Sequence, residues 1–453
     1  MADNITAFAN TGYGIDVFAT DDIGGVNYPR TKIVIGTNGV NDGDVSSVNP
    51  LPISMPSPQS DAFGRLRVSS PETLFDSKLL WDNSPLFWDD QEVSGAGTSS
   101  THSAVLANVT MGVSASTAGK RVRQTYQRFN YQPGKSQQIL CTGVLDASGG
   151  GAGIVRGFGY YDANNGIFLR DNEGTIQFVV RNNGSDTAVN QANWNKDIMN
   201  GSGRSGVNLD LTKTQILFID LEWLGVGTVR VGFVVDGAIY YCHHFNHANV
   251  LTSVYMSTAN LPLRYEIENT GAGAAATLVQ ICSTVISEGG AQSLGVARAA
   301  SSGGTHVDAD TENTIYALLG IRLKSGYLGC NVSIENIAVQ VQTATDPCEW
   351  SLWWNPTVAG TFTYADETNS AVQIAKGATA NTLTNGILIA GGYIESGNVS
   401  TGNAGSGAYG VPSALKLGAS IAGALDTIVL AIRPIAGASN VDAEGTIQWR
   451  ELL

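Results

Sequence analysis

The sequence predicts an all-β protein: an extended N-terminal arm followed by two antiparallel β-sandwiches of jelly-roll or lectin-like type. Three observations support this prediction. Glycine supplies 54 of 453 residues while charged residues make up only 14%, which is typical of short strands joined by tight turns. Runs of β-branched and aromatic residues alternate with Asn-Gly and Asp-Gly turns. Helical periodicity is nearly absent, and only residues 71–80 would allow a helical turn.

Residues 1–70 form the predicted arm. Glycine turns and prolines crowd this segment, and its one strand candidate is residues 31–35. A segment of this kind cannot bury a core of its own, so we expect it to pack on another molecule. The candidate anchoring residues are Tyr28, Pro29, Arg30, Pro50 and Pro52.

Hairpin signals dominate the chain from residue 71 onwards. Residues 156–181 predict three strands, with turns at residues 164–166 and 171–174. The same pattern predicts a hairpin with its turn at Asp236-Gly237, and it recurs near the end around Glu444-Gly445.

A stretch rich in Gly, Ala and Ser divides the strand-rich part of the chain. It covers residues 291–311 and predicts a linker. We therefore expect a first sandwich at residues 71–290 and a second at residues 312–453. The long polar stretches 182–210 and 391–410 predict functional loops.

Charge and cysteine content exclude several classes of protein. The net charge of −14 argues against nucleic-acid binding, which needs a basic surface. No run of eighteen apolar residues and no secretory leader is evident, so we expect a protein that stays soluble in the cytoplasm and does not insert into membranes. The five cysteines are scattered and odd in number, which argues against a disulfide scaffold.

Three groups of segments resemble structural proteins of tailed bacteriophages. They are residues 19–53, then DAFGRLRVSSPETLFDSKLLWD at 61–82 with 123–139, and then 194–237 with NLPLRYEIENTG at 260–271. The resemblance covers about the first 270 residues. It implies a place in a virus particle, where the arm would grip other virion proteins, and it carries no catalytic residues to transfer.

A pair of carboxylates offers an enzymatic alternative. Asp220 and Glu222 in LFIDLEW are two positions apart and would share one face of a strand, as the acid and nucleophile of sandwich-fold glycosidases do. The usual glycosidase strand pattern is not met, because Phe218 and Trp223 occupy its other positions. The simpler interpretation is a half-buried strand.

Histidines and a basic segment are further candidates. His243, His244 and His247 lie beside Cys242 and could ligate a metal, although strand alternation points neighbouring residues to opposite faces. No acidic residue occurs between Val93 and Leu145, so the segment carries a local excess of positive charge. Nucleic acid or an anionic glycan could use such a patch, but in a chain of net charge −14 we expect it to pair with acidic surfaces of a neighbouring copy or of another virion protein. The interface candidates are Arg121, Arg123 and Arg128.

Aromatic residues in and near the long loops are candidates for contact with a sugar or receptor, since aromatic faces can stack on sugar rings. These candidates are Trp194, Trp353, Tyr393 and Tyr409. Trp350 and Trp354 are instead predicted to share the buried face of a strand, opposite Trp353.

These observations lead to one expectation and two alternatives. We expect a non-enzymatic virion component without cofactor, a homotrimeric tail fibre or spike whose distal loops touch a host glycan or protein. The first alternative is a head fibre or decoration protein on the capsid. The second is a glycan-degrading virion enzyme that uses Asp220 and Glu222.

Overall fold

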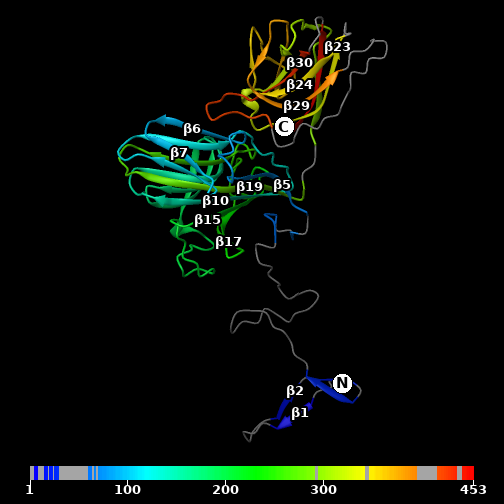
Figure 1. Cartoon of the computed structure of the whole chain (residues 1–453). Helices are drawn as coiled ribbons and strands as arrows, with labels where there is room; N and C mark the ends of the chain where they lie inside the picture. The colour runs from blue at the N-terminus through cyan, green and yellow to red at the C-terminus, as the bar shows by residue number, and fades with distance from the viewer. Residues whose placement is uncertain are drawn as a thin grey trace. The chain divides into compact units, whose positions relative to one another are not determined.

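The computed structural model of the chain contains two compact units, Met1–Pro56 and Ser57–Leu453 (Figure 1). The structure describes residues 5–8, 15–18, 20–23, 25–29, 60–63, 66–67, 70–290, 294–341, 346–394, 416–435 and 441–452. Regular structure in these ranges is β-strand apart from two 3₁₀ turns, Gln191–Asn193 and Ser325–Tyr327. None of their helices is long or apolar enough to cross a bilayer.

The N-terminal unit contains two short hairpins. Strand β1 (Ile5–Phe8) pairs antiparallel with β2 (Ile15–Phe18), and β3 (Thr20–Ile23) pairs with β4 (Val26–Pro29). The sequence predicts none of these four strands, because runs of only four residues between turn signals do not stand out. The candidate strand at 31–35 lies outside the described residues.

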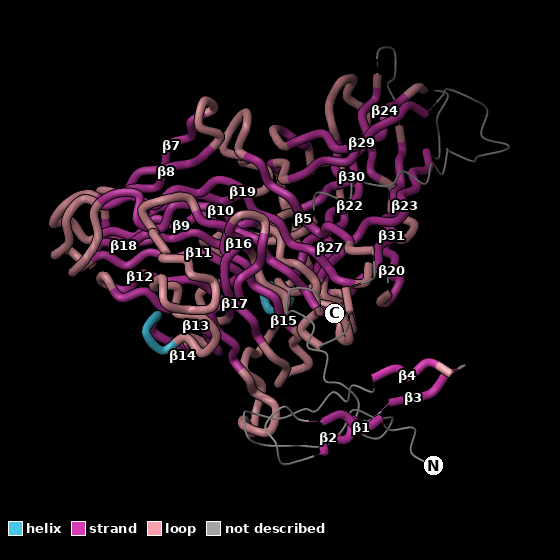
Figure 2. Tube along the Cα trace, turned by 90° about the horizontal axis from the view of Figure 1, so that it is seen from below, coloured by secondary structure: helices cyan, strands magenta, loops and turns pink. Residues whose placement is uncertain are grey.

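The first sandwich packs two antiparallel sheets face to face (Figure 2). One sheet has the order β17-β16-β15-β10-β19-β8-β7, and β5 pairs with β19. We call it the strap sheet, because Ser60 and Arg67, from a short segment that we call the strap, bond to residues on its outer face. The opposing sheet has the order β14-β13-β12-β11-β18-β9-β6. The strands are β5 (Glu72–Lys78), β6 (Trp88–Gly95), β7 (Thr98–Ser103), β8 (Asn108–Val113), β9 (Gly119–Thr125), β10 (Ser136–Ser148), β11 (Ile154–Tyr161), β12 (Gly166–Asn172), β13 (Thr175–Asn182), β14 (Ser185–Asn190), β15 (Gln215–Leu221), β16 (Val229–Val235), β17 (Ala238–Phe245), β18 (Leu263–Asn269) and β19 (Ala276–Glu288).

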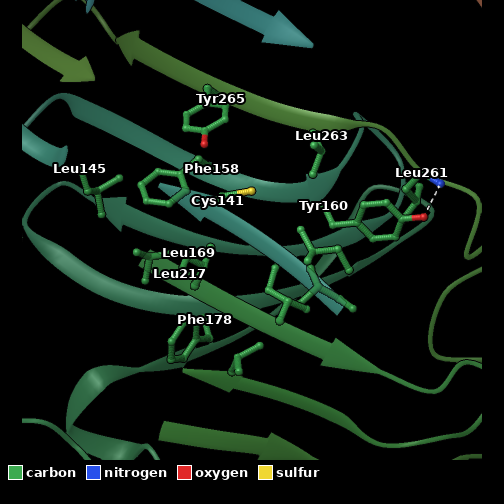
Figure 3. Close-up of a cluster of buried hydrophobic side chains, with 14 of the residues drawn as sticks. Cys141, Leu145, Phe158, Tyr160, Leu169, Phe178, Leu217, Leu261, Leu263 and Tyr265 are labelled. Atoms are coloured by element: carbon green, nitrogen blue, oxygen red, sulfur yellow. Dashed lines mark hydrogen bonds between the residues drawn. The ribbon is translucent and has the colours of Figure 1, made fainter. Parts of the chain in front are cut away.

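Alternation along each strand builds the core between these sheets. In β15, Leu217 and Ile219 are buried in the core, while Phe218 lies on the outer face. Figure 3 shows the aromatic centre of the core, where the rings of Phe158 and Tyr265 stack with centroids 5.1 Å apart. The buried Tyr160 hydroxyl accepts a hydrogen bond from the Leu261 N–H at 3.1 Å (Figure 3), which satisfies a polar group that burial would otherwise leave unpaired.

Two of the three hairpin predictions from turn residues are confirmed. Strands β11, β12 and β13 follow one another in antiparallel register, and so do β16 and β17. At the β16–β17 turn, Asp236 and Gly237 both have positive φ, 51° and 77°. A two-residue turn of this type needs left-handed backbone at both positions, which explains the Asp-Gly pair.

The second sandwich also consists of two antiparallel sheets. In one, β31 is flanked by β20 and β21 on one side and by β23 on the other; the second has the order β26-β27-β22-β30-β24-β29. Its strands are β20 (Val296–Ser301), β21 (Val307–Asp308), β22 (Tyr316–Leu323), β23 (Asn331–Val341), β24 (Cys348–Trp354), β25 (Thr357–Val358), β26 (Ala365–Asp366), β27 (Val372–Lys376), β28 (Leu383–Thr384), β29 (Ile387–Ile394), β30 (Thr427–Pro434) and β31 (Asp442–Leu452). The predicted all-β class with antiparallel sandwiches is thus confirmed.

Three local predictions differ from the structure. Residues 291–311, expected to be a linker, contain β20 and β21, which both pair with β31. The expected turn at Glu444-Gly445 is wrong, because β31 runs through it; a Cβ at Gly445 would lie 3.0 Å from Leu430, so glycine serves packing there. The helical turn at 71–80 is also wrong, since β5 pairs with β19.

We predict that Trp449→Ala destabilises the second sandwich by about 3–5 kcal/mol, because a fully buried indole is replaced by a cavity. The matched control is Trp81→Ala: Trp81 is 88% exposed and should change stability by less than about 0.5 kcal/mol. Urea unfolding followed by circular dichroism measures both. Equal effects of the two substitutions would contradict the assigned core.

Candidate functional site

The predicted carboxylate pair lies at the end of β15, on the outer face of the strap sheet. Asp220 is fully buried, and its Oδ2 accepts hydrogen bonds from the guanidinium groups of Arg67 and Arg230 and, at 2.9 Å, from the Tyr241 hydroxyl. Arg230 and Tyr241 come from β16 and β17, the two strands next along the sheet. Buried charges require partners of this kind, since an isolated carboxylate would be strongly disfavoured.

A short segment crosses this face and supplies Arg67. We call it the strap: residues 60–67, of which 60–63 and 66–67 are described. The Ser60 carbonyl accepts a hydrogen bond from Arg230 at 2.9 Å. Arg67 lies 3.5 Å from the Glu288 carboxylate and over the ring of Phe218, 5.8 Å from its centroid. The strap therefore seals Asp220 from solvent.

The second carboxylate, Glu222, sits just past the end of β15 and is only partly buried. Its Oε1 accepts a hydrogen bond from the Thr228 N–H at 3.0 Å. Burial raises its pKa, and the negative charges of Asp61 and Asp220 add to this shift. A carboxyl group with a raised pKa beside an ion-paired carboxylate is a pattern that acid–base enzymes use. With Asp220 sealed under two arginines, Glu222 is the one carboxylate of the pair that solvent reaches, and a lone carboxylate does not supply the acid and nucleophile that a glycosidase needs.

The three histidines do not converge. His243 Nδ1 accepts a hydrogen bond from the Asn195 N–H at 3.1 Å, whereas His247 Nδ1 lies 2.6 Å from the Gly227 carbonyl. His244 packs edge-on against Tyr241. Burial lowers the pKa of His243 and of His244 to about 4, so both are neutral at pH 7. Within the part of the chain that the structure describes, no group of three His, Cys, Asp or Glu side chains could hold a metal.

The expected interface arginines pair within the chain instead. Arg123 is fully buried and donates to Asp90, to Gln280 and to the Asn83 carbonyl. Arg121 also donates to Asp90, at 2.6 Å, and Arg128 donates to Asp162 at 2.8 Å. The acids that balance this segment lie outside it along the sequence but beside it in space, so these three arginines offer no unpaired positive patch to a neighbour.

The aromatic candidates separate into three cases. Trp194 is a core residue: it is buried and stacks on Phe178 at 4.3 Å, because the polar stretch that holds it folds back on the sandwich. Trp353 is partly buried beside Val429 and Ala431, and its indole N–H donates to Ser351 at 2.8 Å. Tyr393 is 71% exposed. The structure confirms that Trp350 and Trp354 are buried in the core.

The predicted anchoring residues and Tyr409 lie in β4 or outside the described residues. Tyr28 and Pro29 belong to β4. Arg30, Pro50, Pro52 and Tyr409 lie outside the described residues.

Sequence reasoning missed an ion-paired layer on the outer face of the opposing sheet. Arg170 and Arg181 both bond Asp186 and both lie over the Phe168 ring, which stacks on Tyr161 at 4.1 Å. Arg264 covers Tyr161 and bonds Glu266. The alternating charged residues of β18, Arg264, Glu266 and Glu268, are the signal that could have revealed this layer.

Described residues of the larger unit line two shallow grooves, among others. One, of about 450 Å³, is lined by Arg128, Asp162, Asn260 and Tyr327 among others, and the Arg128–Asp162 ion pair occupies part of its wall. The other, of about 360 Å³, is lined by Tyr126, Asn355 and Asp426 among others. Asp426 is nearly fully buried and accepts hydrogen bonds from Asn355 Nδ2 and the Gly418 N–H. Burial raises the pKa of Asp426 to about 6.

Comparison with known proteins shows only distant structural similarity. No protein-family model and no curated sequence matches the chain. An endo-1,3-β-glucanase from Streptomyces sioyaensis is 12% identical over 48% of this chain and 97% of its own, with a TM-score of 0.32. A legume lectin-like domain from Entamoeba histolytica is 13% identical, covering 49% of this chain and 100% of its own (TM-score 0.29). A protein of unknown function from Shewanella oneidensis is 8% identical over 54% of this chain and 99% of its own, with a TM-score of 0.31. A likeness this weak carries no argument about activity.

We predict that Asp220→Asn lowers the free energy of unfolding by about 3 kcal/mol, because it removes the buried carboxylate that Arg67 and Arg230 share. The same change should speed hydrogen exchange in the strap. Asp76→Asn is the control, since the Asp76–Lys78 pair is largely exposed and contributes little. If both variants unfold at the same urea concentration, the strap is not held by Asp220.

A second prediction concerns pH. The folded-state pKa of Asp426 lies above the ordinary value of 3.8, so the folded protein binds this proton more tightly, and stability rises as the pH falls through about 6. Between pH 7.5 and 5.0 the wild type should gain about 1 kcal/mol relative to Asp426→Ala. Urea unfolding of both proteins at the two pH values measures the gain. A constant difference between them would contradict the prediction.

Proposed function

We propose that this chain is a structural component of a tailed bacteriophage particle, held by its N-terminal arm and projecting two β-sandwiches. The proposal rests on a contact between two of the segments that resemble phage proteins. Arg67 belongs to the segment 61–82, while Asp220 and Arg230 belong to the segment 194–237. These residues together form the ion-paired contact that holds the strap against the first sandwich.

Two further features support a structural role. The chain forms a small N-terminal unit and a much larger β unit, as an anchor and a projecting body would require. In the larger unit, the charged residues with the least exposure serve to pair strands and to hold the strap. The carboxylates that could act in catalysis are either sealed or hydrogen-bonded to the backbone.

The proposed role is a tail fibre or spike that takes part in host attachment. The alternative within the same class is a head fibre or a decoration protein on the capsid. The two alternatives differ in copy number: a decoration protein follows the symmetry axes of the capsid, whereas a tail fibre is present in a few sets at the tail.

The test is immunogold labelling of purified phage particles with antibodies raised against residues 57–453. We expect labelling of intact particles, at the tail for a fibre and over the capsid for a decoration protein. Particles that lack this chain should lose most of their adsorption to host cells if it binds the host. Normal adsorption would remove the attachment role, and absence of the chain from purified particles would remove the structural role.

The enzymatic alternative has a direct assay. Purified wild-type protein and an Asp220→Asn/Glu222→Gln variant are incubated with host surface polysaccharide, and released reducing ends are measured. We expect no release by either protein. Release by the wild type that the variant lacks would establish a glycan-degrading enzyme in place of the proposed role.

A further inference from the structure

The six-stranded sheet of the second sandwich ends in an unusual edge strand. Strand β29 (Ile387–Ile394) is terminal in this sheet and pairs with β24 alone among the described strands (Figure 1). The backbone N–H and C=O groups along its other edge therefore form no ladder hydrogen bonds with a described strand. Such an edge is a template for pairing with another chain.

Nothing in the composition of β29 opposes such pairing. Its sequence, ILIAGGYI, contains no charged side chain, and Leu388 and Tyr393 are 50% and 71% exposed. Seven of the other terminal strands of the four main sheets differ in this respect, because each carries at least one Asp, Glu, Lys or Arg. They are β5, β6, β14, β20, β21, β23 and β26, whereas β7 and β17 carry histidine instead. Charged residues at an edge are a common defence against association.

The register of β29 shows which residues would meet a partner. A bulge interrupts pairing with β24 between Leu388 and Ala390, and the regular part runs from Ala390 to Ile394. In this part Ala390, Gly392 and Ile394 face the core, opposite buried residues of β24. Gly391 and Tyr393 face outward, opposite Ser351 and Glu349.

The two glycines have different roles. A Cβ at Gly392 would lie 2.8 Å from the indole nitrogen of Trp350, so the core of the same chain excludes a side chain there. At Gly391 the nearest atoms to a Cβ would be the Trp350 carbonyl at 3.2 Å and Leu388 Cδ1 at 3.9 Å. Gly391 is exposed and has no side chain of its own, so a ring from outside can lie over it, and aromatic residues opposite glycine stabilise paired strands.

We propose that β29 pairs antiparallel with β29 of a second copy of this chain, about a two-fold axis at Gly392. In this register Gly391 lies opposite the partner's Tyr393, and Ala390 lies opposite the partner's Ile394. Each Tyr393 ring then covers Gly391 of the other copy. The apolar residues on both faces of β29 continue into those of the second β29. The interface is isologous, so the same contact occurs twice.

The occupant is a second copy because this strand complements itself. Two uncharged strands meet without like-charge repulsion, although the whole chain carries a net charge of −14. A strand with a charged residue at every second position would form no favourable cross-strand side-chain pairs with the apolar residues of β29. The pairing goes beyond the proposed role in the particle, and its two-fold symmetry differs from the three-fold assembly expected from the sequence.

The first test is the mass of the full-length protein by light scattering after gel filtration. We expect a dimer of about 95 kDa, twice the 47.4 kDa chain. Tyr393→Lys should raise the dimer dissociation constant at least tenfold, because it places two charges beside the pairing axis. Val250→Lys is the matched control, since Val250 is 70% exposed in the first sandwich, and it should leave the mass unchanged.

The second test identifies the edge itself. Hydrogen exchange of amides in residues 387–394 should slow as wild-type concentration rises, and Tyr393→Lys should abolish this dependence. Unchanged circular dichroism establishes that the variant folds. A wild-type mass of one or three copies, or a dimer whose β29 amides exchange at a rate independent of concentration, overturns the proposal. Both results are independent of whether the chain belongs to a virus particle.

Discussion

Pairing between β10 and β19 is the contact on which the rest of the first sandwich depends. Both strands are 13 residues long, the longest in the sheet. β10 also pairs with β15, and β19 also pairs with β8 and β5, so this pair aligns most of the strap sheet. A register shift beside Gly143 interrupts it, where a Cβ would lie 2.4 Å from the Val279 carbonyl. Only glycine permits this close approach.

The position of the strap follows from that alignment. Because β15 is held by β10, Asp220 is fixed on the outer face, where β16 and β17 bring Arg230 and Tyr241 beside it. Two arginines around one carboxylate satisfy the charge that burial would otherwise disfavour. In a chain with few charges, ion pairs of this kind serve the fold and leave little charge for recruiting partners.

Local features are predictable from the sequence, and long-range partners are not. The β11–β12–β13 and β16–β17 hairpins are predictable because their turn residues lie beside the strands they join. The basic segment looks unpaired in the sequence because its counter-charges, Asp90 and Asp162, lie outside the acid-free stretch. Trp194 resembles a surface residue because its neighbours in the sequence are polar, but its ring is stacked in the core.

The carboxylate pair is a second case in which a long-range partner cannot be predicted from the sequence. The spacing of Asp220 and Glu222 is visible in the sequence and predicts that they share one strand face. The strap that seals Asp220 comes from 153 residues earlier in the chain. No local pattern indicates that Arg67 would meet it, because the meeting depends on the completed sheet.

The pairing of β5 with β19 has a consequence for synthesis. The Thr284 hydroxyl donates to the Phe75 carbonyl across 209 residues of chain. At ribosomal rates of about 5–20 residues per second, β5 waits roughly 10–40 seconds for its partner strand to be translated. During this interval the nascent chain exposes an unpaired strand with an apolar face. The first sandwich therefore cannot close around β5 until translation has passed β19.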